Sequence, residues 1–223
     1  MNWQPLWLSF ELALVTMLLL LLIATPIAYF LAFTRMRGRG LMEAVFALPL
    51  VLPPTVLGYF VLVSIGSRSI VGQWYHELLG TSFAFSFEGM VLASILYSLP
   101  FAVQPMQNAF EALDKRLIEA SRTLGLNVWQ SFFRVLLPGA RVGVITGAVL
   151  SFAHTVGEFG VVLMVGGSIP GETRVASIAI YEHVENLEYA EANAMALVLL
   201  AFSFIVLSVV YHYNRRLSRL GTL

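Results

Sequence analysis

The chain has 223 residues, of which 58% are hydrophobic and only 12% are charged. Soluble domains carry roughly 25% charged residues, so this composition excludes an ordinary water-soluble protein and indicates an integral membrane protein. The formal net charge is zero, so the overall charge does not indicate any particular class of partner. The absence of cysteine excludes disulfides and thiolate metal sites.

Five apolar runs are long enough to cross a membrane, because about 20 helical residues span a hydrocarbon layer of ~30 Å. The first run lacks a basic leader and a small-residue cleavage pattern, so we expect a retained helix and not a signal peptide. We therefore expect an all-α integral membrane protein that forms a single transmembrane domain over residues 1–223. The predicted spans are about residues 6–33, 41–66, 89–110, 139–165 and 192–213.

The positions of the basic residues predict the orientation. Five spans put the termini on opposite sides, and eleven of the 13 Lys and Arg residues fall in alternate connecting segments. The positive-inside rule then places the N-terminus outside and the C-terminus in the cytoplasm. The two exceptions are Arg68 and Arg174. The cytoplasmic set is Arg35, Arg37, Arg39, Lys115, Arg116, Arg122, Arg134, Arg141, Arg215, Arg216 and Arg219.

The outer segments are acidic and include residues 175–189, which are too polar to form a sixth span. Their spacing of apolar residues is compatible with a short amphipathic helix at the outer surface.

The longest cytoplasmic connection covers residues 111–138. Good helix formers extend from Glu111, and Gly125 is placed to end that helix in the left-handed conformation. Asn127, with Gln130 three residues later, predicts a capping box that starts a second short helix. Pro138 suits the first turn of the next span, where no intrahelical N–H bond is lost.

This connection resembles the cytoplasmic loop of the permease subunits of binding-protein-dependent ABC importers. The family pattern is Glu-Ala-Ala, three residues, Gly, nine residues, Ile-x-Leu-Pro, and Ser121 and Val135 are small departures from it. The resemblance implies a type I importer permease fold in which the helix pair docks into a groove of the ATPase. The features of the loop alone also allow a simple folded connector. The matching residues are Glu119, Ala120, Ser121, Gly125, Val135, Leu137 and Pro138.

Other segments resemble the molybdate permease branch, and the similarity runs nearly end to end. They are residues 48–54, 123–125, 157–160 and 169–173. The resemblance implies a multi-pass permease of the prokaryotic cell membrane that transports molybdate. Sulfate and tungstate permeases carry similar segments, so both oxyanions remain alternatives. It also implies two ATPase subunits that use ATP and Mg, and an extracytoplasmic oxyanion-binding protein.

A pathway between two copies is expected, because two-fold pairs are the commonest assemblies and five helices leave little interior space. The chain has no phosphate-binding Gly-x4-Gly-Lys-Ser/Thr loop and no metal-ligand spacing, so we expect no cofactor, metal, catalytic or nucleic-acid site. An ion-coupled carrier or channel is the rival class. It would need titratable groups deep in the spans, and Glu11, His154 and Glu158 are the main ones.

The fourth span carries small residues at every fourth position from Gly139, ending with Ser151 and Thr155. We expect this face to pack closely, and its two hydroxyls are candidate donors to a passing oxyanion. His154 and Glu158 are expected one helical turn apart in this span. The family usually has Arg at the position of His154, and we expect Glu158 to accept hydrogen bonds near the outer gate.

Prolines interrupt two of the predicted spans. Pro53 and Pro54, together with Pro49, interrupt the second span, and Pro100 and Pro105 interrupt the third. Such kinks either act as gate elements or only shape the bundle.

Overall fold

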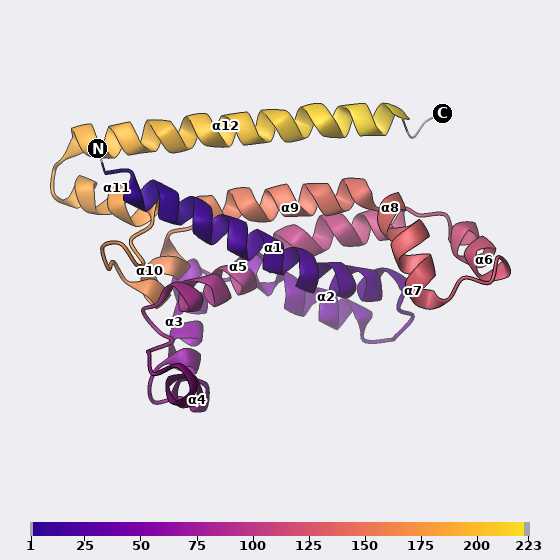
Figure 1. Cartoon of the computed structure of the whole chain (residues 1–223), viewed down its shortest axis with the longest axis horizontal. Helices are drawn as coiled ribbons and strands as arrows, with labels where there is room; N and C mark the ends of the chain where they lie inside the picture. The colour runs from indigo at the N-terminus through magenta and orange to yellow at the C-terminus, as the bar shows by residue number, and fades with distance from the viewer. Residues whose placement is uncertain (1, 221–223) are drawn as a thin grey trace.

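The computed structural model describes residues 2–220, with only the backbone described for Lys115, Arg122 and residues 209–220. Within this range the chain is helical and contains no strand (Figure 1). The elements in chain order are α1 (Gln4–Phe33), α2 (Arg39–Ala47), the 3₁₀ turn η1 (Leu48–Leu50), α3 (Pro54–Ile65), α4 (Ile70–Leu79), α5 (Phe87–Glu111), α6 (Lys115–Thr123), α7 (Val128–Ser131), the π-helix η2 (Phe132–Leu136), α8 (Leu137–Gly139), α9 (Arg141–Val156), α10 (Gly160–Gly166), α11 (Ala176–Glu185) and α12 (Tyr189–Leu220).

Helices α1, α5 and α9 pack against one another and form the centre of the molecule (Figure 1). Ala24 and Ala28 of α1 and Ala102 of α5 are fully buried, so the helices approach closely. Leu20 and Phe110 fill the space beside them. Close packing of small residues is what holds helices together in lipid, where apolar burial alone gives no advantage.

The described helices include three that are long and apolar enough to span a membrane, and five if each bent pair counts as one span. The upper count agrees with the five predicted spans, but the second bent pair is Val128–Gly139 with Arg141–Val156, so the bounds predicted for the fourth span stay a prediction. The second span is bent by 103° between α2–η1 and α3, and Pro53 and Pro54 begin α3 at this bend. A gating role for the two prolines stays a prediction.

Pro100 and Pro105 do not break the third span into two helices, and the kink expected at each proline stays a prediction. Both prolines lie inside α5, which continues as one helix. Neighbouring helices can satisfy the carbonyl groups that a proline leaves free in a membrane helix, and α5 is packed by α1 and α9 on its sides.

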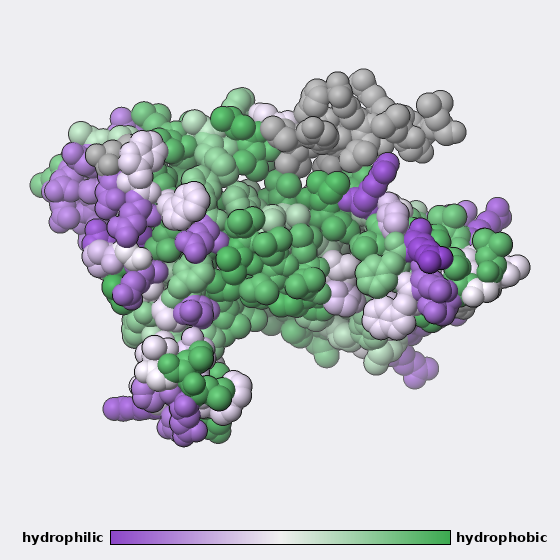
Figure 2. Space-filling view, viewed as in Figure 1, coloured by the Kyte–Doolittle hydropathy of each residue, from purple (hydrophilic) through white to green (hydrophobic). Residues whose placement is uncertain are grey.

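The two ends of the bundle match the predicted orientation. The N-terminus, α10 and α11 lie at one end, and α6, α7 and the C-terminal end of α12 lie at the other (Figure 1). The connecting segments that are rich in Lys and Arg thus share one end, which we take as cytoplasmic. Figure 2 shows an apolar middle between more polar ends.

α4 and α11 are short helices that lie outside the spans and outside residues 111–138. α11 (Ala176–Glu185) confirms the helix predicted in residues 175–189, and its Ile178 is buried. α4 was not predicted, although its end signals are present in the sequence. Ser69 Oγ accepts a hydrogen bond from Gly72 N at 2.9 Å, and Gly80 ends the helix with φ +71°.

Candidate functional site

The predicted coupling segment, residues 111–138, forms a projecting group of short helices at the cytoplasmic end (Figure 1). α5 continues to Glu111, so the first coupling helix begins at Lys115 and not at Glu111. Asp114 Oδ1 accepts a hydrogen bond from Arg116 N at 2.9 Å. This contact satisfies one of the N–H groups that every helix start leaves free.

The turn after α6 has the predicted geometry. Gly125 has φ +77°, and Leu126 N donates to Ser121 O at 3.1 Å, as in a Schellman helix end. Glycine adopts this left-handed conformation without a steric cost. The motif residues Glu119 and Ala120 are exposed on α6 and are open to contact by a partner protein.

The second helix begins with the predicted capping box. Asn127 Oδ1 accepts from Gln130 N at 2.8 Å, and Gln130 Oε1 accepts from Asn127 N at 3.1 Å. Two free N–H groups are satisfied at once, which fixes the start of α7 directly after the turn.

Ser121, a departure from the family pattern, joins the two helices. Its Oγ donates to Ile118 O at 2.8 Å and lies 2.9 Å from Ser131 Oγ, and both serine side chains are buried. No local pattern predicts this pair, because a contact between the two helices depends on how they fold back on each other.

The tip of the coupling segment is apolar although it faces water. We call this surface the apolar tip. An exposed apolar surface at the polar end of a membrane protein marks a protein-binding site. The rings of Trp129 and Phe133 stack with centroids 6.3 Å apart. The apolar tip consists of Leu117, Leu124, Val128, Trp129 and Phe133.

The second half of the segment is anchored in the bundle. The ring of Phe132 lies 5.2 Å from that of Tyr29 on α1 and 6.2 Å from that of Phe110 on α5. Leu136 is also buried, in the same cluster. A projecting element held by two central helices can transmit a push at its tip to both of them.

The last motif residues lie at the passage from the segment to α9. Val135 is in the π-helix η2, while Leu137 and Pro138 form the start of α8. Pro138 therefore lies in the first turn of a short helix before a 72° bend, and not in the first turn of the span itself. A proline fits both positions because neither requires its N–H.

His154 and Glu158 do not lie on one helix, contrary to the prediction. α9 ends at Val156, and Glu158 lies in the break before α10. Glycine at position 157, next to the break, favours the end of a helix. The fourth span, predicted as residues 139–165, is thus divided into two helices.

His154 lies in a polar and aromatic cluster between α5 and α9. Its Nδ1 is 2.9 Å from Ser98 Oγ, which is 3.0 Å from Thr155 Oγ1. Phe101 stacks on the imidazole with ring centroids 4.0 Å apart, and Tyr97 lies at 4.9 Å. The cluster joins the two helices near the break.

Glu158 is 4% exposed, and neither oxygen of its carboxyl group has a hydrogen-bond partner. Ser94 on α5 is the neighbouring hydroxyl, but no hydrogen bond of normal geometry joins it to the carboxyl group. The backbone at this point is fixed, since Ser177 Oγ donates to Glu158 O at 2.6 Å. The predicted gate role of Glu158 stays a prediction.

The small residues of α9 pack against α5. A Cβ on Gly143 would lie 2.3 Å from Ala109 Cβ, and one on Gly147 would lie 2.8 Å from Ala102 O. Ser151 is fully buried, and its Oγ donates to Ala148 O at 3.0 Å. The packing interpretation is confirmed for the glycines. A role of Ser151 and Thr155 in transport stays a prediction.

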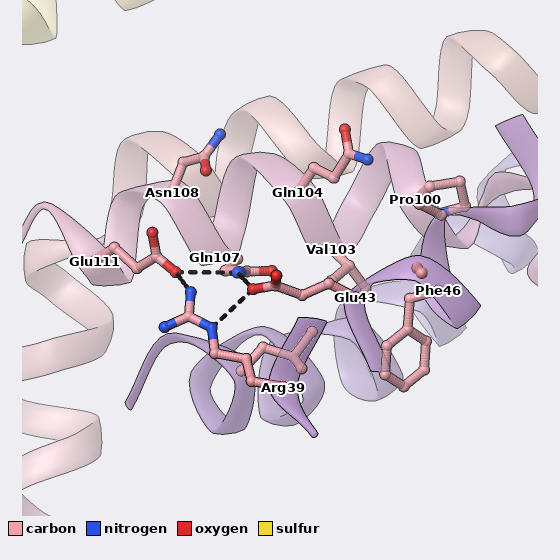
Figure 3. A pocket seen from close by; sticks show the side chains of 12 residues that line it. Arg39, Glu43, Phe46, Pro100, Val103, Gln104, Gln107, Asn108 and Glu111 are labelled. Carbon is pink, nitrogen blue, oxygen red and sulfur yellow. Dashed lines mark hydrogen bonds and ion pairs between the residues drawn. The ribbon is translucent and has the colours of Figure 1, made fainter. Parts of the chain in front are cut away.

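Sequence reasoning missed a ring of four polar side chains between α2 and α5 (Figure 3). Arg39, Glu43, Gln107 and Glu111 are joined by hydrogen bonds and ion pairs. We call these four residues the Arg39 ring. Arg39 counted only as a basic residue in the sequence, and its partner Glu111 is 72 positions away. The described side chains include no group of His, Asp or Glu suited to a metal ion.

A bundle of apolar helices with one basic end and an anchored, projecting helix pair defines the class of membrane permease subunits. The family of binding-protein-dependent transport system inner membrane components matches residues 8–219. The chain belongs to this family. It is a membrane subunit and not an enzyme, and ATP hydrolysis in such importers belongs to a separate subunit.

The molybdenum transport system permease protein ModB of Azotobacter vinelandii is 54% identical over 209 residues, which cover 93% of this chain and 92% of that protein. The ModB protein of Escherichia coli K12 is 37% identical over 97% of this chain and 96% of that protein. The crystal structure of a bacterial ABC transporter involved in alginate import is similar in fold. Its TM-score is 0.75 at 16% identity, covering 96% of this chain and 78% of that chain.

Proposed function

We propose that this chain translocates molybdate into the cell as the permease of an ATP-driven importer. The most direct support for molybdate is the 54% identity to a molybdenum transport permease over nearly the full length of both proteins. Tungstate and sulfate are the alternatives because both are tetrahedral dianions, like molybdate.

One observation carries the mechanism, namely the anchoring of the coupling segment. Phe132 and Leu136 fasten it to the core of the bundle, while Leu124 and Trp129 are 80% and 73% exposed at its apolar tip. A surface of this kind suits docking to an ATPase subunit, since apolar anchors dominate the energy of protein interfaces. Closure of the ATPases would then tilt α5 and α9.

We propose that two copies enclose the pathway. The interior between α1, α5 and α9 is filled by buried side chains and by glycine contacts too tight for a Cβ. This packing leaves no room for an anion to cross within one bundle. A two-fold pair is the commonest way for identical chains to assemble.

In this assembly two ATPase subunits bind ATP and Mg on the cytoplasmic side, and one oxyanion-binding protein docks outside. Both partners act by binding the two conformations of the permease with different affinity, because a ligand without such a preference shifts nothing. We propose Ser151, His154, Thr155 and Glu158, in the last part of α9 and the break before α10, as pathway or gate residues.

The test is uptake of labelled molybdate by vesicles that contain the chain, its ATPase and its binding protein. We expect uptake that requires ATP and that unlabelled molybdate suppresses more strongly than sulfate does. Uptake driven by an ion gradient without ATP would favour the carrier class instead. If sulfate or tungstate suppressed uptake more strongly than unlabelled molybdate does, that anion would be the preferred substrate.

A further inference from the structure

The Arg39 ring joins the first helix of the second span to the end of the third (Figure 3). Arg39 Nε donates to Glu43 Oε1 at 2.8 Å, and Arg39 Nη2 forms an ion pair with Glu111 Oε1. Gln107 Nε2 donates to Glu43 Oε1 at 2.7 Å and to Glu111 Oε1 at 3.0 Å. Two residues come from α2 and two from α5, so the ring closes across the gap between these helices.

The position of the ring connects the coupling segment to the bend of the second span. Glu111 is the last residue of α5, and only residues 112–114 separate it from α6. Arg39 is the first residue of α2, which leads through η1 to the 103° bend before α3. A movement of the coupling segment therefore reaches α2 most directly through this ring.

Apolar packing provides only part of this connection. No residue of α2 is buried, whereas α1 and α5 share a cluster of fully buried residues. Phe46 and Met42 of α2 are only partly buried against that cluster. The polar contacts of the ring thus add a directional link between α2 and α5 to this partial packing.

The ring also borders a pocket of about 550 Å³ that includes Gln104 and Asn108. A binding site for the oxyanion is the obvious alternative for this place. Two carboxylates face the single guanidinium group, however, which leaves a formal charge of −1 that repels a dianion. The charges suit a link between helices better than an anion receptor.

We propose that Arg39 is a positioning residue for transport, which makes α2 follow α5 when the ATPases move the coupling segment. This inference rests on the proposed function. Without the ring, the ATPase subunits would still bind the coupling segment and move α5, but α2 and the bend to α3 would no longer follow. ATP would then be hydrolysed with less transport.

The test measures molybdate taken up per ATP hydrolysed in vesicles that contain the complete transporter. We expect Arg39→Glu and Glu111→Arg each to lower this ratio at least about fivefold, the lower end of typical coupling between sites. The double variant restores an opposite-charge pair between positions 39 and 111, and we expect it to regain most of the ratio. Arg37→Glu is the matched control, because Arg37 is exposed and forms no ion pair among the described side chains.

The amount of ATPase bound to each variant shows whether it has assembled. Unchanged ratios in both single variants, or a double variant no better than either, would overturn the proposal. The native transporter in the same assay separates the two claims. If it shows no ATP-dependent uptake, the proposed function fails, whereas native uptake with an unaffected Arg39→Glu variant removes only the role of Arg39.

A second measurement does not depend on transport. The chain has no cysteine, so Ala44→Cys and Asn108→Cys carry the only spin labels, and mixing the labelled chain with an excess of unlabelled chain limits the signal to the distance between α2 and α5 of one copy. We expect one narrow distance distribution that is the same with and without ATP, and a broad distribution when Arg39→Glu is added. A distance that changes with ATP in the otherwise native chain would contradict a fixed link.

Discussion

The hydroxyl oxygens of Ser121 on α6 and Ser131 on α7 lie 2.9 Å apart, and both side chains are buried. Together with the packing of Ile118, this hydrogen bond ties the first coupling helix to the anchored second half of the segment. A buried polar atom that loses its partner costs more than a normal hydrogen bond contributes, so the two serines depend on each other.

Replacing Ser121 by Ala is therefore expected to loosen α6. Ser131 Oγ is left without its partner, and the cost is on the order of 1 kcal/mol. Hydrogen exchange of residues 115–131 measures this directly, and we expect faster exchange in the single variant. The double variant Ser121→Ala with Ser131→Ala removes both hydroxyls and should exchange more slowly than the single variant. Equal exchange rates in the native and Ser121→Ala chains would show that the serine pair does not stabilise α6.

The turn at Gly125 gives a second prediction. A β-branched residue at φ +77° is strained by about 1–2 kcal/mol, although a Cβ there would meet no neighbouring atom. We expect Gly125→Val to bind the ATPase more weakly while the chain still inserts in the membrane. Gly125→Asn is the control, because asparagine tolerates this conformation and should keep the affinity. If the ATPase copurifies equally with all three chains, the turn does not set the shape of the docking element.

The apolar tip is expected to carry the affinity for the ATPase. Trp129→Ala removes an exposed aromatic side chain that is available as an interface anchor, and such residues often contribute about 2 kcal/mol or more. The dissociation constant of the ATPase should rise at least about tenfold. Trp3→Ala is a matched control, because Trp3 is 63% exposed at the opposite end. If both variants bound the ATPase with the same affinity, the docking surface would not be the apolar tip.

The contact between α5 and α9 gives a prediction on stability. A Cβ at position 143 would overlap Ala109 Cβ and lie 2.5 Å from Pro105 O. We expect Gly143→Ala to lower the free energy of unfolding by about 1–3 kcal/mol, seen as a lower melting temperature in detergent. Gly157→Ala is the control, since the nearest atoms there are 3.8 Å away. A melting temperature unchanged in Gly143→Ala would mean that the helices are less closely packed than described.

Local signals in the sequence predict much of this structure. The apolar runs indicate the five spans, and the chemistry of Gly125, Asn127 and Gln130 predicts the turn and the capping box of the coupling segment. These features depend on residues a few positions apart, so a single sequence contains the necessary information.

The missed features depend on contacts between distant parts of the chain. The Arg39 ring needs α2 and α5 side by side, and Arg39 alone resembles any basic residue at the end of a span. Pro105 suggests an interrupted helix, but packing against α9 keeps α5 continuous. The break at Glu158 lies within an apolar run whose hydropathy does not show where the helix ends.

The central claim is that the coupling segment faces the cytosol and is held there by the ATPase. Labelling of a single cysteine tests it most directly, because the native chain has none. Leu124→Cys places the thiol at the apolar tip, where a membrane-impermeant maleimide is added to either side. The account predicts labelling only from the cytoplasmic side, and protection when the ATPase is bound. Labelling of this cysteine from the outside would contradict it.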